Sequence, residues 1–288
     1  MELPSYNLTL KNEETIKCEP WETGTGMAGY KWIVPNQRAI LLYQHAFGDY
    51  TQRLTKDRSR FIPHVLESGI SVYGIDMPGC GHSPGRRGAA DPFAAVRHHL
   101  TARALLADAD VPIFLAGHSL GGLVTATSVV KDETNVAGAI LVAPALKYEV
   151  NRPTRWLAQL GGSIVPDRKL PLRKGSVYNL TRDVEAQQQL LSDPLLDAPG
   201  ITWITAKGVL YYSFRNWSRY NRITVPVMSI HGTHDTATAP SGSVQFIDSV
   251  SSEDKTLQLV DGGLHDLFDD IVSDEVRDSI IDWMTARI

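Results

Sequence analysis

The sequence predicts an α/β protein with a mostly parallel central sheet, helices on both faces of that sheet and an inserted helical segment. Short, nearly continuous apolar runs indicate strands that are buried on both faces of a parallel sheet. Helical patterns separate these runs, which favours βαβ units. The alternation stops at Ala143-Pro144 and resumes only after Tyr220, which marks the insertion.

The elements are expected in the following order. Residues 6–17 alternate in polarity, and residues 29–34 are rich in aromatic and β-branched side chains, so an antiparallel pair of strands opens the chain. Buried strands are expected at 39–43, 70–75, 111–116, 136–142, 225–230 and 256–260. Helices are expected at 93–107, 120–130 and about 274–287.

No parallel-strand pattern occurs between residues 144 and 220. Prolines interrupt this segment, and apolar side chains recur in it at helical spacing: Trp156, Leu157, Leu160 and Ile164. We predict a helical cap over 144–220, inserted into a core made of 1–143 and 221–288. Open α/β sheets bind ligands outside the carboxyl ends of their strands, so the cap is expected to cover that edge.

Composition excludes several classes of protein. The 288 residues are 43% hydrophobic and 21% charged, which is typical of a globular domain. A net charge of -4 gives no reason to expect a nucleic-acid partner. The cysteines, Cys18 and Cys80, form no disulfide framework, and neither a signal peptide nor a membrane-spanning run is apparent. We therefore expect a cytoplasmic protein.

The segment Gly117-His118-Ser119-Leu120-Gly121 has the pattern of a nucleophile elbow. An apolar strand precedes it and a helical pattern follows it, which is the context that this motif requires. The glycines would let strand and helix approach closely while Ser119 is held on a strained turn. Ser119 is the candidate nucleophile, in preference to a serine that only caps a helix.

A serine hydroxyl needs a base to remove its proton and an acid to orient that base. Asp235 and His265 each follow a predicted strand downstream, in the chain order Ser, Asp, His. The carboxyl ends of parallel strands share one edge, so the three side chains are expected to meet there. Asp261 and Asp266 are rival acids, but Asp266 directly follows the histidine and would point away from it.

We predict surface, structural or packing roles for most of the other histidines. The adjacent His98 and His99 on a predicted helix are expected at the solvated surface. No metal-ligand spacing surrounds His231 and His234, so we predict structural roles for them and no metal site. We expect the remaining two near the elbow, His45 and His118, to be packing groups behind the site.

An oxyanion hole needs two backbone N–H groups. One is expected from Leu120, the residue after the nucleophile. The other is expected from Phe47, in the loop after the first parallel strand.

At this point the chain resembles the monoacylglycerol lipase and lysophospholipase branch of the α/β-hydrolases, which is grouped with serine aminopeptidase-like hydrolases. The segments that carry the resemblance are HAFG at 45–48, DMPGCGHSPG at 76–85, the elbow, LTRD at 180–183 with DPL at 193–195, HGTHD at 231–235 and GGLHD at 262–266. The resemblance implies the triad Ser119, Asp235 and His265, ester hydrolysis without a metal or cofactor, and an apolar tunnel under the cap.

Two residues depart from the pattern of that branch. Ala46 replaces the first glycine of the usual His-Gly-x-Gly, and it would be strained if the position required a positive φ. Phe47 is bulkier than the residue usual at its position and would narrow the pocket. Both departures bear on substrate range, because neither removes an N–H group.

The predicted activity is serine-dependent hydrolysis of a lipid-like ester, of the monoacylglycerol or lysophospholipid class. A thioester, an amide or a small non-lipid ester is the alternative substrate, and a non-catalytic receptor on the same scaffold is a third interpretation. The cap carries eleven basic and six acidic residues, which indicates either a solvated surface or contact with an anionic lipid surface. Its aromatic residues could line an acyl tunnel or attach the cap to the core: Trp203, Tyr211, Tyr212, Phe214 and Trp217.

Overall fold

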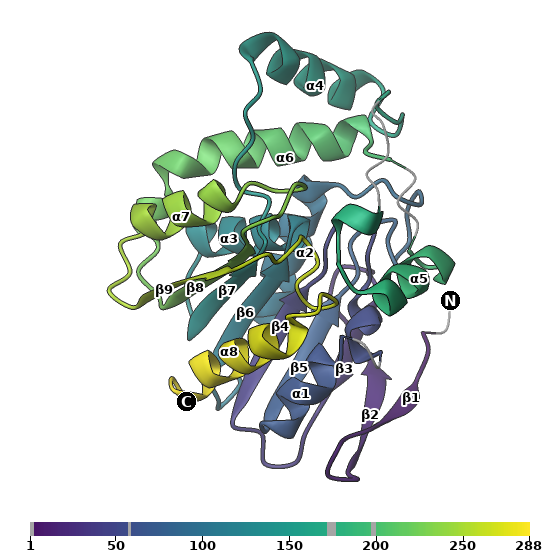
Figure 1. Ribbon diagram of the computed structural model, residues 1–288, viewed down its shortest axis with the longest axis vertical. Coiled ribbons are helices and arrows are strands. Elements are labelled where there is room, and N and C mark those ends of the chain that lie inside the picture. The colour runs from purple at the N-terminus through teal and green to yellow at the C-terminus, as the bar shows by residue number, and fades with distance from the viewer. Residues whose placement is uncertain (1–2, 57–58, 172–176, 197–199) are drawn as a thin grey trace.

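The computed structural model describes residues 3–56, 59–171, 177–196 and 200–288. Within these ranges nine strands form one sheet in the order β1-β2-β3-β5-β4-β6-β7-β8-β9 (Figure 1). The strands are β1 (Tyr6–Thr9), β2 (Thr15–Pro20), β3 (Gly29–Trp32), β4 (Ala39–Gln44), β5 (Ile70–Ile75), β6 (Ile113–His118), β7 (Gly138–Val142), β8 (Val227–Gly232) and β9 (Lys255–Val260). Strands β4 to β9 pair in parallel, which confirms the predicted α/β fold class.

The antiparallel edge differs from the prediction. One strand was expected over 6–17, but β1 and β2 are two strands of a hairpin, and with β3 they make three antiparallel strands. The reversal lies between Leu10 and Glu14, whose carbonyl accepts from the Leu10 N–H at 2.8 Å. Glu13 adopts a φ of 67° there. The expected single strand was wrong because a polar run reverses the chain inside the alternating segment.

Three parallel strands begin later than their apolar runs: β7 begins at Gly138 and not at residue 136, and β6 and β8 begin after a proline. The expected starts were residues 111 and 225, whereas β6 and β8 begin at Ile113 and Val227. In each case a proline, Pro112 or Pro226, stands just before the strand and has no N–H to donate to a neighbour. Each proline still accepts a hydrogen bond through its carbonyl, at 2.9 Å.

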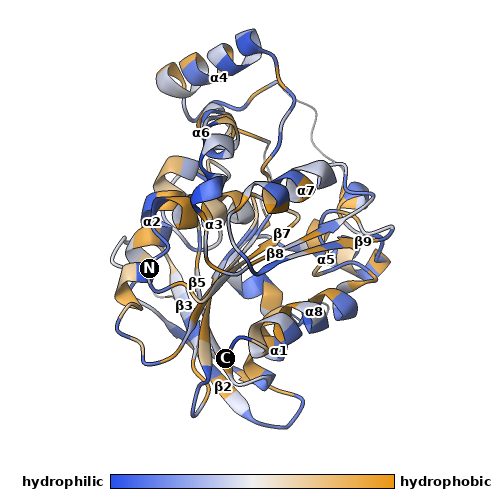
Figure 2. Ribbon diagram, turned by 90° about the vertical axis from the view of Figure 1, so that its left-hand side faces the viewer, coloured by the Kyte–Doolittle hydropathy of each residue, from blue (hydrophilic) through white to orange (hydrophobic). Residues whose placement is uncertain are grey.

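Helices cover both faces of the sheet (Figures 1 and 2). Helices α1 and α8 pack on one face, where Phe61, Val276 and Ile280 join a fully buried cluster. Helices α2, α3 and α7 supply apolar side chains to the cluster on the other face. Their bounds are α1 (Phe61–Glu67), α2 (Pro92–Leu105), α3 (Leu120–Lys131), α7 (Pro240–Ser249) and α8 (Ser273–Thr285).

The chain between β7 and β8 forms helices α4 (Arg152–Ile164), α5 (Val184–Ser192) and α6 (Trp203–Arg215). Helix α6 contacts α2 and α3, and α4 lies on α6 as the outermost helix in Figure 1. Ring contacts attach α6 to α2, since the centre of the Phe93 ring lies 5.3 Å from the ring centres of both Tyr211 and Tyr212. These two aromatic residues therefore hold this insertion on the core. The limits 144–220 for a cap stay a prediction.

Helix α4 exposes the apolar side chains that its sequence pattern aligns. Trp156 and Ile164 are 66% and 68% exposed, and Leu157 and Leu160 are exposed as well. The side of α4 that faces α6 is instead made of small residues, because Ala158 and Gly162 are the buried positions among its residues. No helix in the described ranges is long and apolar enough to cross a bilayer.

The position of His99, on α2, differs from the prediction. His99 was expected at the surface, but it is fully buried, with Nδ1 3.0 Å from the Ser128 hydroxyl. The surface expectation was wrong for His99 because α3 packs along this side of α2. Burial, with a smaller contribution from Arg103, lowers the pKa of His99 to about 3, so the ring is neutral.

We expect the buried neutral His99 to make the fold sensitive to acid. Its folded-state pKa lies below the ordinary 6.5, so the unfolded chain binds one more proton between these values. Stability is lost as the pH falls below 6.5, by up to about 1.4 kcal/mol per pH unit. The free energy of unfolding is measured in urea at about pH 7 and about pH 5. Between these pH values it should fall less for His99→Gln than for wild type, by up to about 1.4 kcal/mol per pH unit. His234→Gln, at an exposed histidine, is the control. Identical pH dependence of wild type and His99→Gln would contradict this.

Candidate active site

Ser119 stands on a strained turn between β6 and α3. Its φ of 55° and ψ of -115° lie outside the regions that a serine normally adopts. The turn is held on both sides. The Ser119 N–H donates to the Val142 carbonyl at 2.9 Å, and its carbonyl accepts from the N–H groups of Leu123 and Ala145. The predicted elbow is thus present in the geometry of the backbone.

The elbow requires its two outer glycines. A Cβ on Gly117 would lie 2.3 Å from the Gly121 carbonyl oxygen, and a Cβ on Gly121 would lie 2.1 Å from that of Gln44. No real Cβ approaches backbone so closely, so any other residue would push strand and helix apart.

The structure brings the three predicted site residues together. His265 Nε2 lies 2.9 Å from Ser119 Oγ, and His265 Nδ1 lies 2.7 Å from Asp235 Oδ2. Asp235 follows β8 and His265 follows β9, so the common sheet edge supplies all three groups. All three are buried. The arrangement can transfer a proton from the hydroxyl to an imidazole that a carboxylate orients.

Five donor atoms surround the Asp235 carboxylate. His265, His231 and the Thr238 hydroxyl lie 2.7, 3.1 and 2.8 Å from Oδ2, and the N–H groups of Ala237 and Thr238 donate to Oδ1 at 2.7 and 3.0 Å. Burial alone would raise the pKa of Asp235. The hydrogen bonds from His231 and His265 overcome that effect and hold the pKa well below its usual range. Asp235 therefore stays ionised.

Sequence reasoning missed two hydroxyls in this network. Ser243 Oγ lies 2.7 Å from His231 Nδ1, on the far side of the ring from Asp235, and Thr238 contacts the carboxylate directly. Since Nε2 of His231 donates to Asp235, Nδ1 accepts from Ser243. No spacing rule in the sequence distinguishes these two residues from other polar residues near Asp235.

His118 and His45 support the site from behind. Burial, and then the neighbouring His265, lower the pKa of His118 to about 3. The neutral ring lies with Nε2 3.1 Å from the His265 carbonyl. His45 Nε2 accepts from the Met77 N–H at 2.7 Å, so Nδ1 donates to the Ala46 carbonyl. The two rings fix the loops that carry His265 and Phe47.

The predicted oxyanion donors, the N–H groups of Phe47 and Leu120, have no acceptor among the described residues. Ala46 does not adopt a positive φ, whereas Gly48 does, at 71°. The alanine is therefore unstrained, and the positive φ that the loop needs falls on a glycine. Phe47 is half-buried and packs against the core.

The two rival acids lie apart from His265 Nδ1. Asp266 is buried and its carboxylate lies 3.1 Å from Arg53. Asp261 is exposed, and its nearest polar contact in the described structure is the Thr233 hydroxyl at 3.4 Å. Asp235 is the carboxylate that meets the histidine ring.

A buried ion cluster links the loops on either side of the site. The Arg53 guanidinium contacts Asp49 at 2.7 Å, Asp266 at 3.1 Å, and Asp269. Asp49 lies two residues after Phe47, and Asp266 directly follows His265. Burial opposes ionisation of Asp49, but Arg53 lowers the pKa of that carboxyl overall. The guanidinium thereby ties the loop of Phe47 to the loop of His265.

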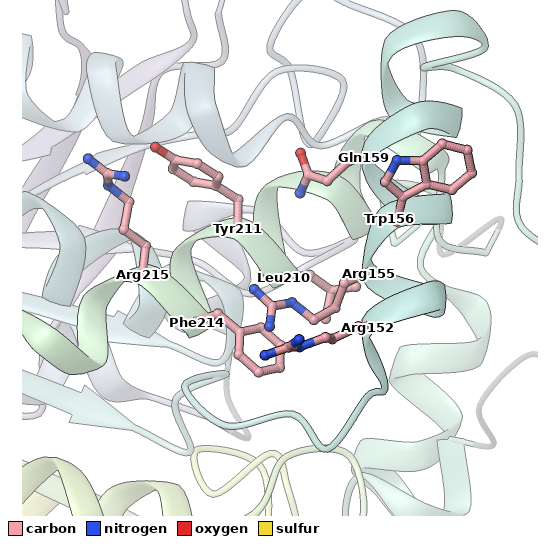
Figure 3. Close-up of a pocket in the computed structure, with 8 residues that line it drawn as sticks. All are labelled: Arg152, Arg155, Trp156, Gln159, Leu210, Tyr211, Phe214 and Arg215. Carbon is pink, nitrogen blue, oxygen red and sulfur yellow. The ribbon is translucent and has the colours of Figure 1, made fainter.

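A cavity of about 760 Å³ lies between α4 and α6, away from the triad (Figure 3). None of its lining residues belongs to the triad or to the Phe47 loop. Tyr211 and Phe214, two of the cap aromatics with two possible roles, line the cavity.

Cys80 is a buried side chain of the core, and burial raises the pKa of its thiol to about 12.

Known proteins similar to this chain are hydrolases and lipases. A model of the family described as serine aminopeptidase, S33, matches residues 35–271. The chain is 29% identical over 283 residues to the monoglyceride lipase of Saccharomyces cerevisiae, covering 88% of this chain and 86% of that one. A crystal structure of a monoacylglycerol lipase from Paleococcus ferrophilus superposes with a TM-score of 0.81 at 26% identity, covering 91% of this chain and 99% of that one.

A third relative is much longer than this chain. An abhydrolase domain-containing protein of Dictyostelium discoideum is 26% identical over 286 residues, which is 98% of this chain but 29% of that protein's length. The family model covers most of the chain. The chain belongs to the serine aminopeptidase, S33, family of α/β-hydrolases.

Proposed function

We propose that the protein is a serine hydrolase that cleaves carboxylic esters of a lipid-like substrate, of the monoacylglycerol or lysophospholipid class. The observation that carries the proposal is the chain of hydrogen bonds from Ser119 Oγ through His265 to Asp235. The relatives named monoglyceride lipase and monoacylglycerol lipase support the substrate class.

In the proposed reaction Ser119 Oγ attacks the ester carbonyl carbon while His265 Nε2 takes its proton. The tetrahedral intermediate collapses when the imidazolium returns that proton to the leaving alcohol, which leaves an acyl group on Ser119. Water, deprotonated by His265, attacks the carbonyl carbon of this acyl-enzyme. The imidazolium then returns the proton to Ser119 Oγ as the carboxylic acid is released. Asp235 stays ionised throughout and keeps the proton of the neutral ring on Nδ1.

The N–H groups of Phe47 and Leu120 are the proposed donors to the oxyanion. Both are free of other partners within the described residues, so they need not break a bond to serve. Donors fixed in advance stabilise the developing charge without reorganisation, and one such donor is worth about 3–4 kcal/mol of barrier.

Hydrolysis of graded 1-monoacylglycerols tests the substrate class. We expect kcat/KM to rise at least about tenfold from butanoyl to octanoyl glycerol, because each buried methylene contributes up to about 0.8 kcal/mol. An octanoyl lysophospholipid in the same assay separates the two lipid classes, and the matched octanoyl amide and thioester measure the preference for oxygen esters. A flat or falling profile with chain length would contradict a lipid substrate and favour a small ester.

We also propose peripheral contact of α4 with a lipid surface. Its outward side exposes Trp156, Leu157, Leu160 and Ile164, and basic residues stand at both ends of the helix: Arg152, Arg155, Arg168 and Lys169. An apolar face flanked by basic side chains suits the boundary between headgroups and acyl chains.

We also propose a cytoplasmic location. The buried thiols of Cys18 and Cys80, which form no disulfide, support it.

Sedimentation with vesicles tests this contact. We expect wild-type protein to sediment with vesicles that contain anionic lipid, and Leu160→Ser with Ile164→Ser to weaken binding about tenfold, since two exposed apolar side chains no longer enter the interface. Leu105→Ser, at an exposed leucine on α2, is the matched control. Equal sedimentation of the α4 variant and wild type, or none with either vesicle type, would contradict the contact.

A further inference from the structure

The cavity between α4 and α6, called the α4–α6 groove below, has a shape set by glycines. At one end α4 touches α6, because a Cβ on Gly161 would lie 2.3 Å from the Trp203 ring and one on Gly162 would lie 2.6 Å from Lys207. Toward the start of α4 the side chains are large, and the helices stand apart around Tyr211 and Phe214 (Figure 3). The result is a wedge that is closed at one end.

The groove is positively charged, because Arg152, Arg155 and Arg215 line it. In Figure 3 Arg155 lies at Phe214 and Arg215 lies at Tyr211. No aspartate or glutamate is among the lining residues. Within the described part of the chain, none of these three guanidinium groups forms an ion pair. The groove thus gathers three positive charges with no anion of its own to balance them.

Cation–π contacts with aromatic rings restrain two of these arginines. The Arg155 guanidinium carbon lies 3.7 Å from the centre of the Phe214 ring, and that of Arg215 lies 5.5 Å from the centre of the Tyr211 ring. A stacked guanidinium keeps its N–H donors at its edge, where they match the two oxygens of a carboxylate. Leu210 extends the apolar wall beside these donors.

We infer that the α4–α6 groove binds a single-chain carboxylate, with its head at the arginines and its acyl chain along the aromatic wall. The volume of about 760 Å³ is in the range of small-molecule sites. A compact anion without a chain would leave the apolar wall exposed, and a neutral lipid would leave the arginines unbalanced. The choice of a fatty-acid carboxylate rests on the proposed function, because ester hydrolysis releases that group.

Calorimetric titration with decanoate below its micellar concentration tests the inference. Protein whose Ser119 is blocked by a short phosphonate is used, so that the acid cannot occupy the triad. We expect Arg152→Gln with Arg155→Gln to weaken decanoate binding at least about tenfold, since two charge-assisted contacts are lost. Arg168→Gln, an exposed arginine on the same segment but outside the groove, should bind as wild type does.

Two further probes define the head group. Decanol should bind at least about tenfold more weakly than decanoate if the arginines recognise charge. Equal affinities for decanol and decanoate, or equal decanoate affinities for the groove variant and wild type, would overturn the inference. Tighter binding of decyl phosphate than of decanoate would overturn the carboxylate as the occupant. Failure of the phosphonate to label Ser119 would instead count against the proposed hydrolase, and decanoate binding to unblocked protein would then decide the groove separately.

Discussion

Ser119→Ala is expected to abolish ester turnover while leaving the fold intact. The methyl group of alanine cannot attack a carbonyl, and loss of the nucleophile of a triad typically costs about 10⁴-fold or more in kcat. The measurement is hydrolysis of a nitrophenyl ester, together with covalent labelling by a fluorophosphonate probe. We expect wild type to be labelled on Ser119 and the variant to be neither active nor labelled.

The fold of Ser119→Ala can be checked independently, because the elbow is held by backbone hydrogen bonds that alanine keeps. Its urea midpoint should match that of wild type. Ser128→Ala, at a buried serine on α3 that contacts His99, is the matched control and should retain both labelling and turnover. Residual turnover above a tenth of the wild-type rate in Ser119→Ala would refute the assignment of the nucleophile, and labelling without turnover in wild type would indicate a receptor.

Arg53→Met is expected to destabilise the protein by about 3–5 kcal/mol. It removes the guanidinium that contacts Asp49, Asp266 and Asp269 within the described residues, and it leaves the buried charges of Asp49 and Asp266 without that cation. Burial raises the pKa of Asp266 even with the guanidinium present, so Arg53 does not fully offset the cost of burying that carboxylate. The measurement is the free energy of unfolding in urea.

Two comparisons make the Arg53 result specific. Arg287→Met, which breaks the exposed pair with Asp254, should change stability by no more than about 1 kcal/mol. Adding Asp266→Asn to Arg53→Met should recover part of the loss, because one buried anion is removed. A small effect of Arg53→Met, or a double variant less stable than the single one, would show that the cluster does not bear on stability as its burial implies.

Local patterns in the sequence predicted the parallel sheet well. Continuous apolar runs such as residues 39–43 and 70–75 identify β4 and β5, because a strand covered on both faces has no polar side. The same reasoning failed at residues 6–17, because a polar run around Glu13 reverses the chain inside a segment that otherwise alternates in polarity. It also failed for His99, whose neighbour across the helix pair comes from a distant part of the chain.

For the candidate site, motifs and chain order were enough to select Ser119, Asp235 and His265. A Cβ on Gly117 or Gly121 would lie 2.3 or 2.1 Å from a backbone oxygen, so the glycines of the motif are required by close backbone approach. The partners of Asp235 were not predictable in this way. Thr238 and Ser243 are ordinary polar residues until the loop after β8 brings them to His231 and the carboxylate.

The sequence by itself determined the class of fold, the order of its parallel strands along the chain and the three residues of the candidate triad, because each depends on residues close together or on a pattern shared with one family. Only the tertiary structure decided which contacts those residues make. Arg53 meets three carboxylates, two of them more than 200 residues away, and α4 meets α6 so that a charged groove opens between them. Such contacts depend on how helices and loops pack against a sheet, and packing involves residues that no local pattern relates.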